Sequence, residues 1–230
     1  MTVADNYNRI QKAIKQACEL AGRDSNINII AVTKYVSLQK TEEALRAGIT
    51  HLGENRMEGA LEKWEHFHDK ATLHFIGSLQ SKKAKHIIEK YDYIHSLDRL
   101  SLAKELDKRC PEGRKIRCFV QVNVSGEDSK SGIQPDEAVD FIESLKEFAA
   151  VEVVGLMTMA PYEKNPEDTR PIFRRLRELR DRIRSLNYPH APCGELSMGM
   201  SNDYTVAVEE GATYIRIGSL LVGNEQGNAK

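Results

Sequence analysis

Residues 28–54 read NIIAVTKYVSLQKTEEALRAGITHLGE, which gives a strand, a helix and a second strand in succession. Asn28–Tyr35 is an apolar run rich in β-branched residues, as is typical of a buried strand. Ser37 can cap the helix that follows, and Gly48 stands where the C-terminus of a helix favours glycine. The segment His51–Glu54 then predicts the next strand. A strand–helix–strand unit of this length indicates two parallel neighbouring strands.

The same alternation continues to the end of the chain, and one further helix precedes the first strand. Eight units fit a closed barrel, whereas an open doubly wound sheet uses about five to seven strands. No strand leads into a G-x-G-x-x-G turn. We therefore predict class α/β, a single parallel (β/α)8 barrel of the TIM type with an extra N-terminal helix. The expected strands are Asn28–Tyr35, His51–Glu54, Leu73–Gly77, Tyr93–Ser96, Ile116–Val124, Glu152–Met159, Glu195–Met198 and Tyr214–Ile217. The expected helices are Tyr7–Ala21, Ser37–Ala47, Asn55–His68, Ser81–Lys90, Arg99–Arg109, Pro135–Phe148, Pro166–Leu186 and Tyr204–Glu210.

Two of these helix starts depend on single residues. Asp98 is expected to cap the helix that begins at Arg99, because a carboxylate can accept from amides of the first turn. Pro135 is expected at the first helical position, where its missing N–H costs nothing.

The composition indicates one globular domain over residues 1–230. The 33 basic and 34 acidic residues give a net charge of −1, which lacks the basic footprint of a nucleic-acid-binding protein. No apolar run approaches the roughly 20 residues that cross a bilayer, and the polar N-terminus is unlike a secretory signal. Four scattered cysteines, without a C-x-x-C pair, indicate free thiols in a reducing compartment. We expect a cytoplasmic protein with no nucleic-acid or membrane partner, and we expect a monomer.

Lys34 is the most informative single residue, because it ends an otherwise apolar strand. It shares a pleat face with Val32 and Ile30, and a buried lysine charge is costly. One interpretation is structural: the amine reaches water or pairs with Glu54. The other is chemical, because burial lowers the pKa of a lysine and a neutral amine can form a Schiff base with an aldehyde.

The ends of strands seven and eight form a second group of candidates. In barrels the loops after these strands often bind phosphate, and Ser201, Gly218 and Ser219 occupy them. Ser201 also stands near the start of a helix, which favours an anion. The alternative is that these are only turn and capping residues. Arg216 lies within the apolar strand just before Gly218, either as a ligand-facing donor or in a salt bridge with Glu54 or Glu195.

Other polar groups favour no such site. The seven histidines show no metal-ligand spacing, so we expect no metal. The arginines of Arg174–Arg184 alternate with an apolar stripe, which is typical of a solvated helix face. A partner or nucleic-acid surface on this face is the alternative. Lys130 lies in a polar loop at the expected barrel mouth and could attract phosphate or receive a cofactor.

Seven separated motifs give the chain a resemblance to a known family. They are Ala31-Val32-Thr33-Lys34, Gly53-Glu54-Asn55, His74-Phe75-Ile76-Gly77-Ser78-Leu79-Gln80, Ser129-Lys130-Ser131-Gly132, Gly155-Leu156-Met157-Thr158-Met159, Ser197-Met198-Gly199-Met200-Ser201-Asn202-Asp203 and Arg216-Ile217-Gly218. In these motifs and their order the chain resembles the pyridoxal phosphate homeostasis protein family, which in turn resembles the barrel domain of alanine racemase.

The resemblance implies pyridoxal 5′-phosphate as cofactor and a role for each residue of the site. Lys34 would be the Schiff-base lysine, and Arg216 would face the pyridine nitrogen. The phosphate would be held by Ser201, Gly218 and Ser219, while Asn55 and Ser197 would lie near the ring.

The resemblance further implies a carrier and regulator of intracellular pyridoxal phosphate, without evident catalysis. An arginine facing the ring nitrogen weakens the ring as an electron sink. The second domain that supplies a tyrosine acid/base in the racemases is not expected after strand eight. Apo-enzymes that use pyridoxal phosphate are the expected recipients of the cofactor. The alternative is a pyridoxal phosphate-dependent racemase or related enzyme, with Tyr35, Tyr162 or Tyr204 as acid/base.

Overall fold

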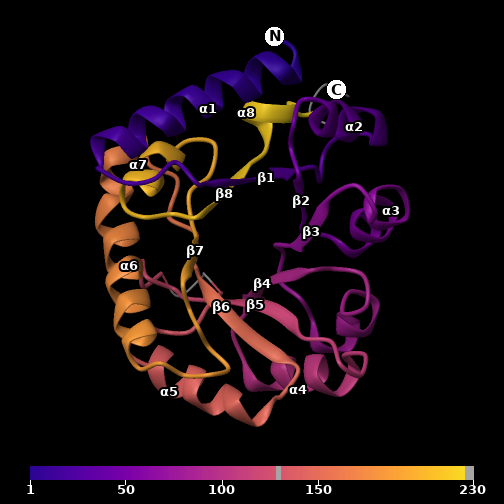
Figure 1. Ribbon diagram of the computed structural model, residues 1–230, viewed down its shortest axis with the longest axis vertical. Helices are drawn as coiled ribbons and strands as arrows, with labels where there is room; N and C mark the ends of the chain where they lie inside the picture. The colour runs from indigo at the N-terminus through magenta and orange to yellow at the C-terminus, as the bar shows by residue number, and fades with distance from the viewer. Residues whose placement is uncertain (128–130, 226–230) are drawn as a thin grey trace.

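Eight parallel strands form a closed barrel in the computed structural model, which describes residues 1–127 and 131–225. The strands follow one another around the barrel in chain order, and β1 closes the ring by pairing with β8 (Figure 1). The predicted α/β class and (β/α)8 architecture are confirmed. The strands are β1 (Asn28–Val32), β2 (His51–Glu54), β3 (Thr72–Phe75), β4 (Tyr93–Leu97), β5 (Ile116–Gln121), β6 (Val151–Met157), β7 (Glu195–Ser197) and β8 (Tyr214–Ile217).

Helices lie between the strands and surround the barrel (Figure 1). Within the described residues, no helix is long and apolar enough to cross a membrane. The α-helices are α1 (Val3–Leu20), α2 (Leu38–Arg46), α3 (Met57–Phe67), α4 (Leu100–Arg109), α5 (Ala138–Ser144), α6 (Arg170–Ser185), α7 (Tyr204–Glu209) and α8 (Ser219–Val222). Three 3₁₀ segments complete the set, namely η1 (Ser81–His86), η2 (Leu145–Glu147) and η3 (Pro166–Thr169).

The extra N-terminal helix is present and begins earlier than predicted, at Val3 instead of Tyr7. Thr2 accepts a hydrogen bond from the Asp5 amide, and the Asp5 carboxylate accepts one from the Thr2 amide. This reciprocal pair is a capping box, which satisfies two of the donors that a helix start leaves open. The helix packs against α7 and α8, so it covers the last units of the barrel (Figure 1).

Several predicted boundaries are wrong for local reasons. The first strand ends at Val32, because its pairing with β2 stops at Gly53 and the chain then turns, with the Val36 amide bonded to the Thr33 carbonyl. Residues 135–137 form a turn, so α5 begins at Ala138 and Pro135 lies outside it.

The segment predicted as a helix over 81–90 is a short 3₁₀ turn, η1. Asp98 is not a cap either: its carboxylate pairs with the Arg99 guanidinium, and α4 starts at Leu100 without a side-chain cap.

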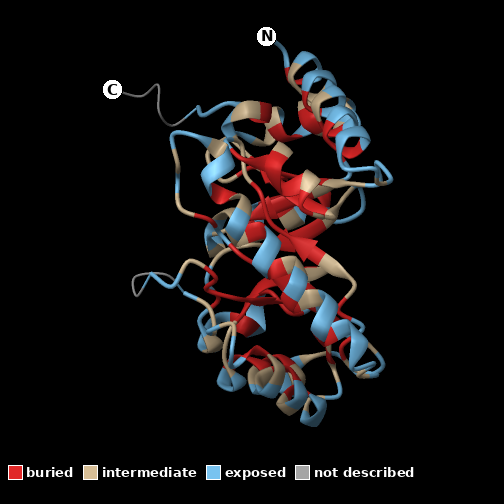
Figure 2. Ribbon diagram, turned by 90° about the vertical axis from the view of Figure 1, so that its left-hand side faces the viewer, coloured by how far each residue is buried: buried red, intermediate tan, exposed pale blue. Residues whose placement is uncertain are grey.

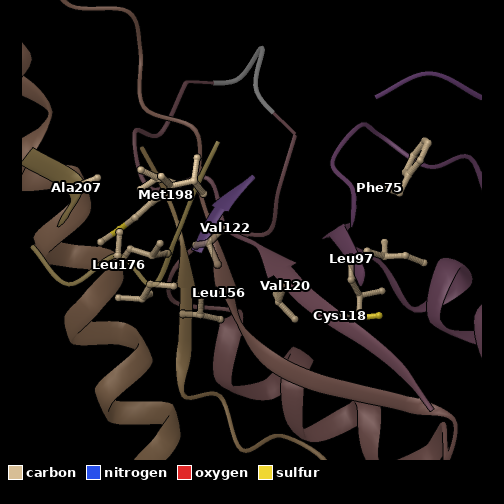
Figure 3. Close-up of a cluster of buried hydrophobic side chains, with 14 of the residues drawn as sticks. Phe75, Leu97, Cys118, Val120, Val122, Leu156, Leu176, Met198 and Ala207 are labelled. Carbon is tan, nitrogen blue, oxygen red and sulfur yellow. The ribbon is translucent and has the colours of Figure 1, made fainter. Parts of the chain in front are cut away.

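The strands bury both faces, as parallel strands in a barrel must. The outward face packs on the helices, and Figure 3 shows Val120 and Leu156 of the sheet with Leu176 of α6 in this outer layer. Figure 2 shows the buried strands inside a shell of exposed helix surface. The inward face carries a smaller apolar group formed by Ile30, Phe119, Met157 and Tyr214. Polar side chains occupy much of the remaining barrel interior.

The arginine-rich helix α6 buries the predicted apolar stripe, of which Phe173, Leu176, Leu179 and Ile183 are buried. The prediction of a solvated basic face holds for the exposed arginines of α6 and is wrong for Arg177 and Arg180, which are partly buried. Arg170, Arg174 and Arg177 all form ion pairs with the buried carboxylate of Glu210, at the end of α7. Arg180 donates to the Gly194 carbonyl. The first three arginines therefore join α6 to α7, and Arg180 joins α6 to the segment just before β7.

Candidate functional site

A pocket of about 610 Å³ opens at the carboxyl ends of the strands. This is the end at which (β/α)8 barrels bring together loops from different units, and the volume suits a small organic ligand. The walls come from the segments that follow β1, β2, β3, β6, β7 and β8, together with the end of β5. The lining residues are Val32, Lys34, Tyr35, Asn55, Ile76, Gly77, Ser78, Gln121, Met159, Pro161, Tyr162, Met200, Ser201, Asn202, Asp203, Arg216, Gly218, Ser219, Gly223 and Asn224.

Lys34 lies in the turn directly after β1 and its side chain is half-buried in the pocket wall. Its amine lies 4.7 Å from the centre of the Tyr35 ring, and the Arg56 guanidinium lies 5.9 Å from the same ring. No ion pair joins Lys34 to Glu54 or to another carboxylate within the described part of the chain. The amine is therefore available to a ligand, and the salt-bridge interpretation of Lys34 is wrong.

A buried polar cluster fixes the turn that carries Lys34. Thr33 donates to Glu54, and the Lys63 amine donates to the Val36 carbonyl and to the Thr41 hydroxyl. Burial raises the pKa of Glu54 and lowers the pKa of Lys63, and each is opposed by the charge of the other. The cluster thus holds the backbone on both sides of Lys34, which fixes the point at which its side chain enters the pocket wall.

The loop after β7 is shaped by a glycine and a buried carboxylate. Gly199 has a φ of +91°, and a Cβ there would lie 2.5 Å from the Cβ of Ala207. Asp203 accepts from the Met200 amide at 2.6 Å, which closes the turn before α7. Burial raises the pKa of Asp203, while the Met200 amide and Arg216 oppose that shift. The turn presents Ser201 to the pocket.

The loop after β8 contributes backbone donors. Gly218 precedes α8, and its carbonyl accepts from the amides of Leu221 and Val222. The first amides of a helix have no acceptor within it, so those at Ser219 and Leu220 can donate to a ligand. Ser219 and Gly218 line the pocket beside Val32 of β1. This is the arrangement of donors that binds phosphate in many proteins.

Arg216 is the buried cation of the site, and its side chain reaches the pocket from inside the barrel. It donates to the Ser197 hydroxyl at 2.7 Å and to the Thr158 carbonyl at 2.9 Å. Burial lowers the pKa of Arg216 to about 10, opposed by Asp203, so the guanidinium stays charged at neutral pH. Within the described residues it forms no ion pair with Glu54 or Glu195, which excludes the barrel salt bridge considered from the sequence.

Asn55 follows β2 and offers an unsatisfied acceptor. Its side-chain oxygen is buried and has no hydrogen-bond partner in the described structure, although the residue lines the pocket. An orphaned buried carbonyl costs free energy unless a ligand or water pairs with it. Together with the amine of Lys34, the charge of Arg216 and the donors of Ser201 and Ser219, it fits a ligand that carries a carbonyl, polar ring substituents and a phosphate.

Six of the seven residues predicted for the site line this pocket, and the seventh lies behind it. Ser197 is fully buried and accepts a hydrogen bond from Arg216, which lines the pocket. Asp203 is a further charged group of the wall, beside Arg216. A row of three histidines behind Ser197, of which His74 and His95 are fully buried, was not predicted from the sequence. Its only signal was one histidine on the inward face of each of β2, β3 and β4.

Two further expectations from the sequence concern a metal ion and Lys130. Within residues 1–127 and 131–225, no group of three or more His, Cys, Asp or Glu side chains could hold a metal ion. Lys130 lies outside the described residues.

The sequence matches the family model described as the N-terminal domain of alanine racemase over residues 4–226. The chain belongs to this family. It is 41% identical to a pyridoxal phosphate homeostasis protein of Aquifex aeolicus, with 98% of this chain and 100% of the relative aligned. It is 37% identical to the protein of the same name from Pseudomonas aeruginosa, with 96% and 95% aligned.

Solved structures are similar over nearly the whole chain. PipY of Synechococcus elongatus, solved with pyridoxal phosphate bound, aligns with a TM-score of 0.82 and 32% identity, covering 96% of this chain and all of PipY. An alanine racemase of Clostridium difficile aligns with a TM-score of 0.74 at 15% identity, and this chain covers 56% of it. At that identity the likeness to the racemase shows the fold alone.

Proposed function

We propose that this chain binds pyridoxal 5′-phosphate at the pocket and acts as a carrier and regulator of that cofactor, without catalysis of its own. The observation that carries the proposal is the convergence of the Lys34 amine, the Asn55 acceptor and the Arg216 cation on one pocket. Relatives that align along the whole chain are named pyridoxal phosphate homeostasis proteins, and PipY was solved with the cofactor bound.

Each residue has a role that its chemistry suits. Pyridoxal phosphate would supply an aldehyde group. An aldehyde condenses with a primary amine, and the aldehyde oxygen is released as a water molecule. Lys34 provides that amine, and Arg216 and Asn55 orient the ring. Ser201, Gly218 and Ser219 hold the phosphate, while Ser197 acts on the site through its hydrogen bond with Arg216.

Borohydride reduction followed by peptide mapping tests the attachment. The reduced protein should carry the cofactor mass on the peptide that contains Lys34, and Lys34→Ala should abolish both that mass and the absorbance band of the lysine adduct. Lys40→Ala is a matched control, because Lys40 lies on the neighbouring helix and pairs with Glu43. Modification that persists in Lys34→Ala, on Lys130 or elsewhere, would refute Lys34 as the attachment site.

Exchange of the α-hydrogen of amino acids with deuterated solvent tests the absence of catalysis. A panel of amino acids incubated with the loaded protein should show no exchange above that of free pyridoxal phosphate. Exchange that is lost in Lys34→Ala would instead support a racemase, with Tyr35 or Tyr162 of the pocket wall as the acid/base.

The partners and the location form the finer part of the proposal. The recipients of the cofactor are apo-enzymes that use pyridoxal phosphate, and the protein acts as a monomer in the cytoplasm. Four unpaired cysteines support a reducing compartment. Transfer to an apo-enzyme at a rate above release into buffer, and a monomer mass by light scattering, are the expected results.

A further inference from the structure

A continuous row of hydrogen-bonding groups crosses the barrel interior and ends at the pocket. His51 Nδ1 lies 2.9 Å from His74 Nε2, and His74 Nδ1 lies 2.9 Å from His95 Nε2. His95 Nδ1 lies 2.9 Å from the hydroxyl of Ser197, which accepts from Arg216 at 2.7 Å. Four strands, β2, β3, β4 and β7, thus connect to the arginine of β8. None of the roles proposed for the pocket uses the three imidazoles.

Aromatic neighbours hold these rings in place. The ring of His74 stacks on Tyr93 with centres 4.5 Å apart, and that of His95 stacks on Phe119 at 4.3 Å. His74 and His95 are fully buried. His51 is partly exposed and lines a small pocket of about 70 Å³ near the strand starts, together with residues of α1. Among these three rings, as the described residues enclose them, only His51 belongs to a residue that solvent reaches.

The number of protons in the row is fixed by burial. Burial lowers the pKa of His51, and it lowers the pKa of His74 and His95 well below the ordinary value, so all three are neutral at pH 7. A neutral imidazole has one donor and one acceptor nitrogen. Each hydrogen bond between two rings joins Nδ1 of one to Nε2 of the next, and one but not both of these two nitrogens must carry the hydrogen. All three rings must therefore carry their hydrogen on the same nitrogen, either Nδ1 or Nε2.

The Ser197 hydroxyl selects between these two arrangements. If the rings carry the hydrogen on Nδ1, this hydroxyl accepts from both His95 and Arg216, and its own hydrogen lacks an acceptor among its described contacts. If they carry it on Nε2, the hydroxyl donates to His95 and accepts from Arg216, which satisfies it. The second arrangement also points every acceptor end toward the cation.

This alignment of the imidazole dipoles stabilises the positive charge of Arg216. Such support matters because the guanidinium is buried and no anion contacts it within the described residues. Its two hydrogen-bond acceptors, Ser197 and Thr158, are neutral, and the nearby Asp203 acts only through its field. No ion pair to Arg216 occurs within the described residues. A buried charge without such support costs several kcal/mol in general. Dipoles aligned in one direction supply part of that support.

We propose that His51, His74 and His95 are positioning residues, which share the Nε2–H tautomer and form a one-directional relay that holds Ser197 and aims Arg216 at the pocket. The relay is a property of the cofactor-free protein. Only its effect on ligand affinity rests on the proposed binding of pyridoxal phosphate.

Imidazole ¹⁵N NMR of the cofactor-free protein at pH 7.5 tests the relay without any ligand. All three histidines should show the Nε2–H pattern, with assignments from single substitutions. His66 and His68 serve as internal controls, because their Nδ1 atoms lie 2.9 Å from backbone carbonyls and should carry the hydrogen. An Nδ1–H tautomer or an imidazolium at any of the three relay positions would overturn the proposal.

A pair of substitutions at His95 tests whether the histidine row acts on the pocket through Ser197. The side-chain oxygen of asparagine can stand near the position of Nδ1 and accept from Ser197, whereas the amide of glutamine reaches toward His74. Affinity for pyridoxal phosphate should fall more in His95→Gln than in His95→Asn, by about tenfold, since one hydrogen bond to the arginine support is lost.

Equal affinities of His95→Gln and His95→Asn for pyridoxal phosphate would overturn the proposed action through Ser197, even if the cofactor binds normally. Absence of binding in the parent protein would instead refute the proposed function and leave the NMR result to decide the relay. If either variant fails to fold, the tautomers of the parent protein still decide it.

Discussion

At the scale of single residues, the barrel interior keeps three imidazoles uncharged while an arginine nearby stays charged. The difference follows from their intrinsic proton affinities, because burial that lowers the pKa of Arg216 to about 10 leaves it protonated, whereas a similar penalty deprotonates a histidine. The buried histidines therefore act as neutral hydrogen-bonding groups at neutral pH, and they connect folding stability to pH.

The free energy of unfolding should fall as the pH drops below about 6.5. Burial lowers the pKa of His74 in the folded state, so below the ordinary histidine value the unfolded chain binds a proton that the folded chain does not. Its stabilisation is present above that value and is lost as the pH falls. The loss is about 2 kcal/mol between pH 7 and pH 5 for one such histidine.

Urea titrations of the parent protein and of His74→Phe at pH 7 and pH 5 check this. Phenylalanine can keep the stack on Tyr93 while removing the titration, so the pH-dependent loss should shrink by about 2 kcal/mol. His86→Gln, at an exposed position, is the control and should lose as much free energy of unfolding between pH 7 and pH 5 as the parent protein does. An unchanged loss in His74→Phe would contradict the argument.

The two cationic residues of the site, Lys34 and Arg216, were predictable because a charge on an apolar strand is rare. The glycines and serines beside Gly218 follow from barrel geometry. The histidine row was not predictable by the same reasoning. A neutral imidazole fits a strand as an ordinary residue, and His51 and His74 meet only because their strands are neighbours in the closed barrel.

At the scale of elements, the loop after β7 depends on a backbone shape that only glycine adopts easily. Gly199→Ala should destabilise the protein by about 2–4 kcal/mol, because alanine is strained at φ +91° and its Cβ would overlap Ala207. The loop carries Ser201, so affinity for pyridoxal phosphate should fall as well. Chemical denaturation and cofactor titration measure the two effects.

Gly113 provides the matched control for this substitution. It also has a positive φ, +77°, but a Cβ there meets nothing within 4 Å. Gly113→Ala should therefore cost only the backbone strain, about 1–2 kcal/mol, and leave affinity unchanged. If both variants lost stability and affinity equally, close packing against Ala207 would not be the reason for the glycine.

The N-terminal helix offers a second prediction at this scale. Thr2→Ala removes the side-chain half of the capping box and should lower the free energy of unfolding by about 1 kcal/mol. Affinity for pyridoxal phosphate should not change, since α1 supplies no residue to the pocket wall. Thermal denaturation and cofactor titration of Thr2→Ala and of Thr50→Ala, an exposed threonine outside helices and strands, make the comparison.

The elements themselves follow from sequence more closely than their ends do. Alternating apolar strands and amphipathic helices predict the order of the barrel, because each unit must bury one helix on one strand. The ends depend on tertiary partners: β1 stops where β2 no longer pairs with it, at Val32, three residues before the apolar run ends. The start of α5 moves past Pro135 for a similar reason, since the preceding turn takes the residues up to Glu137.

At the scale of the whole molecule, the pocket joins parts of the barrel that are far apart in the chain. Its walls run from Val32 to Asn224, so a ligand bound there contacts both the first and the last units. The barrel is closed by the pairing of β1 with β8, and Gly218 lies against Val32 across that seam. A ligand that bridges the seam should therefore oppose global unfolding and not only local opening.

Pyridoxal phosphate should raise the midpoint of thermal unfolding of the whole chain in one transition. At a free concentration of 100 times the dissociation constant, a ligand that binds only the folded state adds about 2.7 kcal/mol, or roughly 5–10 °C for a chain of this size. Scanning calorimetry measures the shift. Inorganic phosphate at the same concentration separates the contribution of the phosphate loops from that of Lys34.

The variants locate the source of this shift. Lys34→Ala should show a smaller shift of the unfolding midpoint than the parent, because the phosphate loops still bind the cofactor. Adding Arg216→Lys should reduce that shift further, because a single ammonium cannot donate to Ser197 and Thr158 as the guanidinium does. Two transitions of which only one responds to the cofactor would contradict a single domain, since one closed sheet and one shared pocket require the first and last units to unfold together.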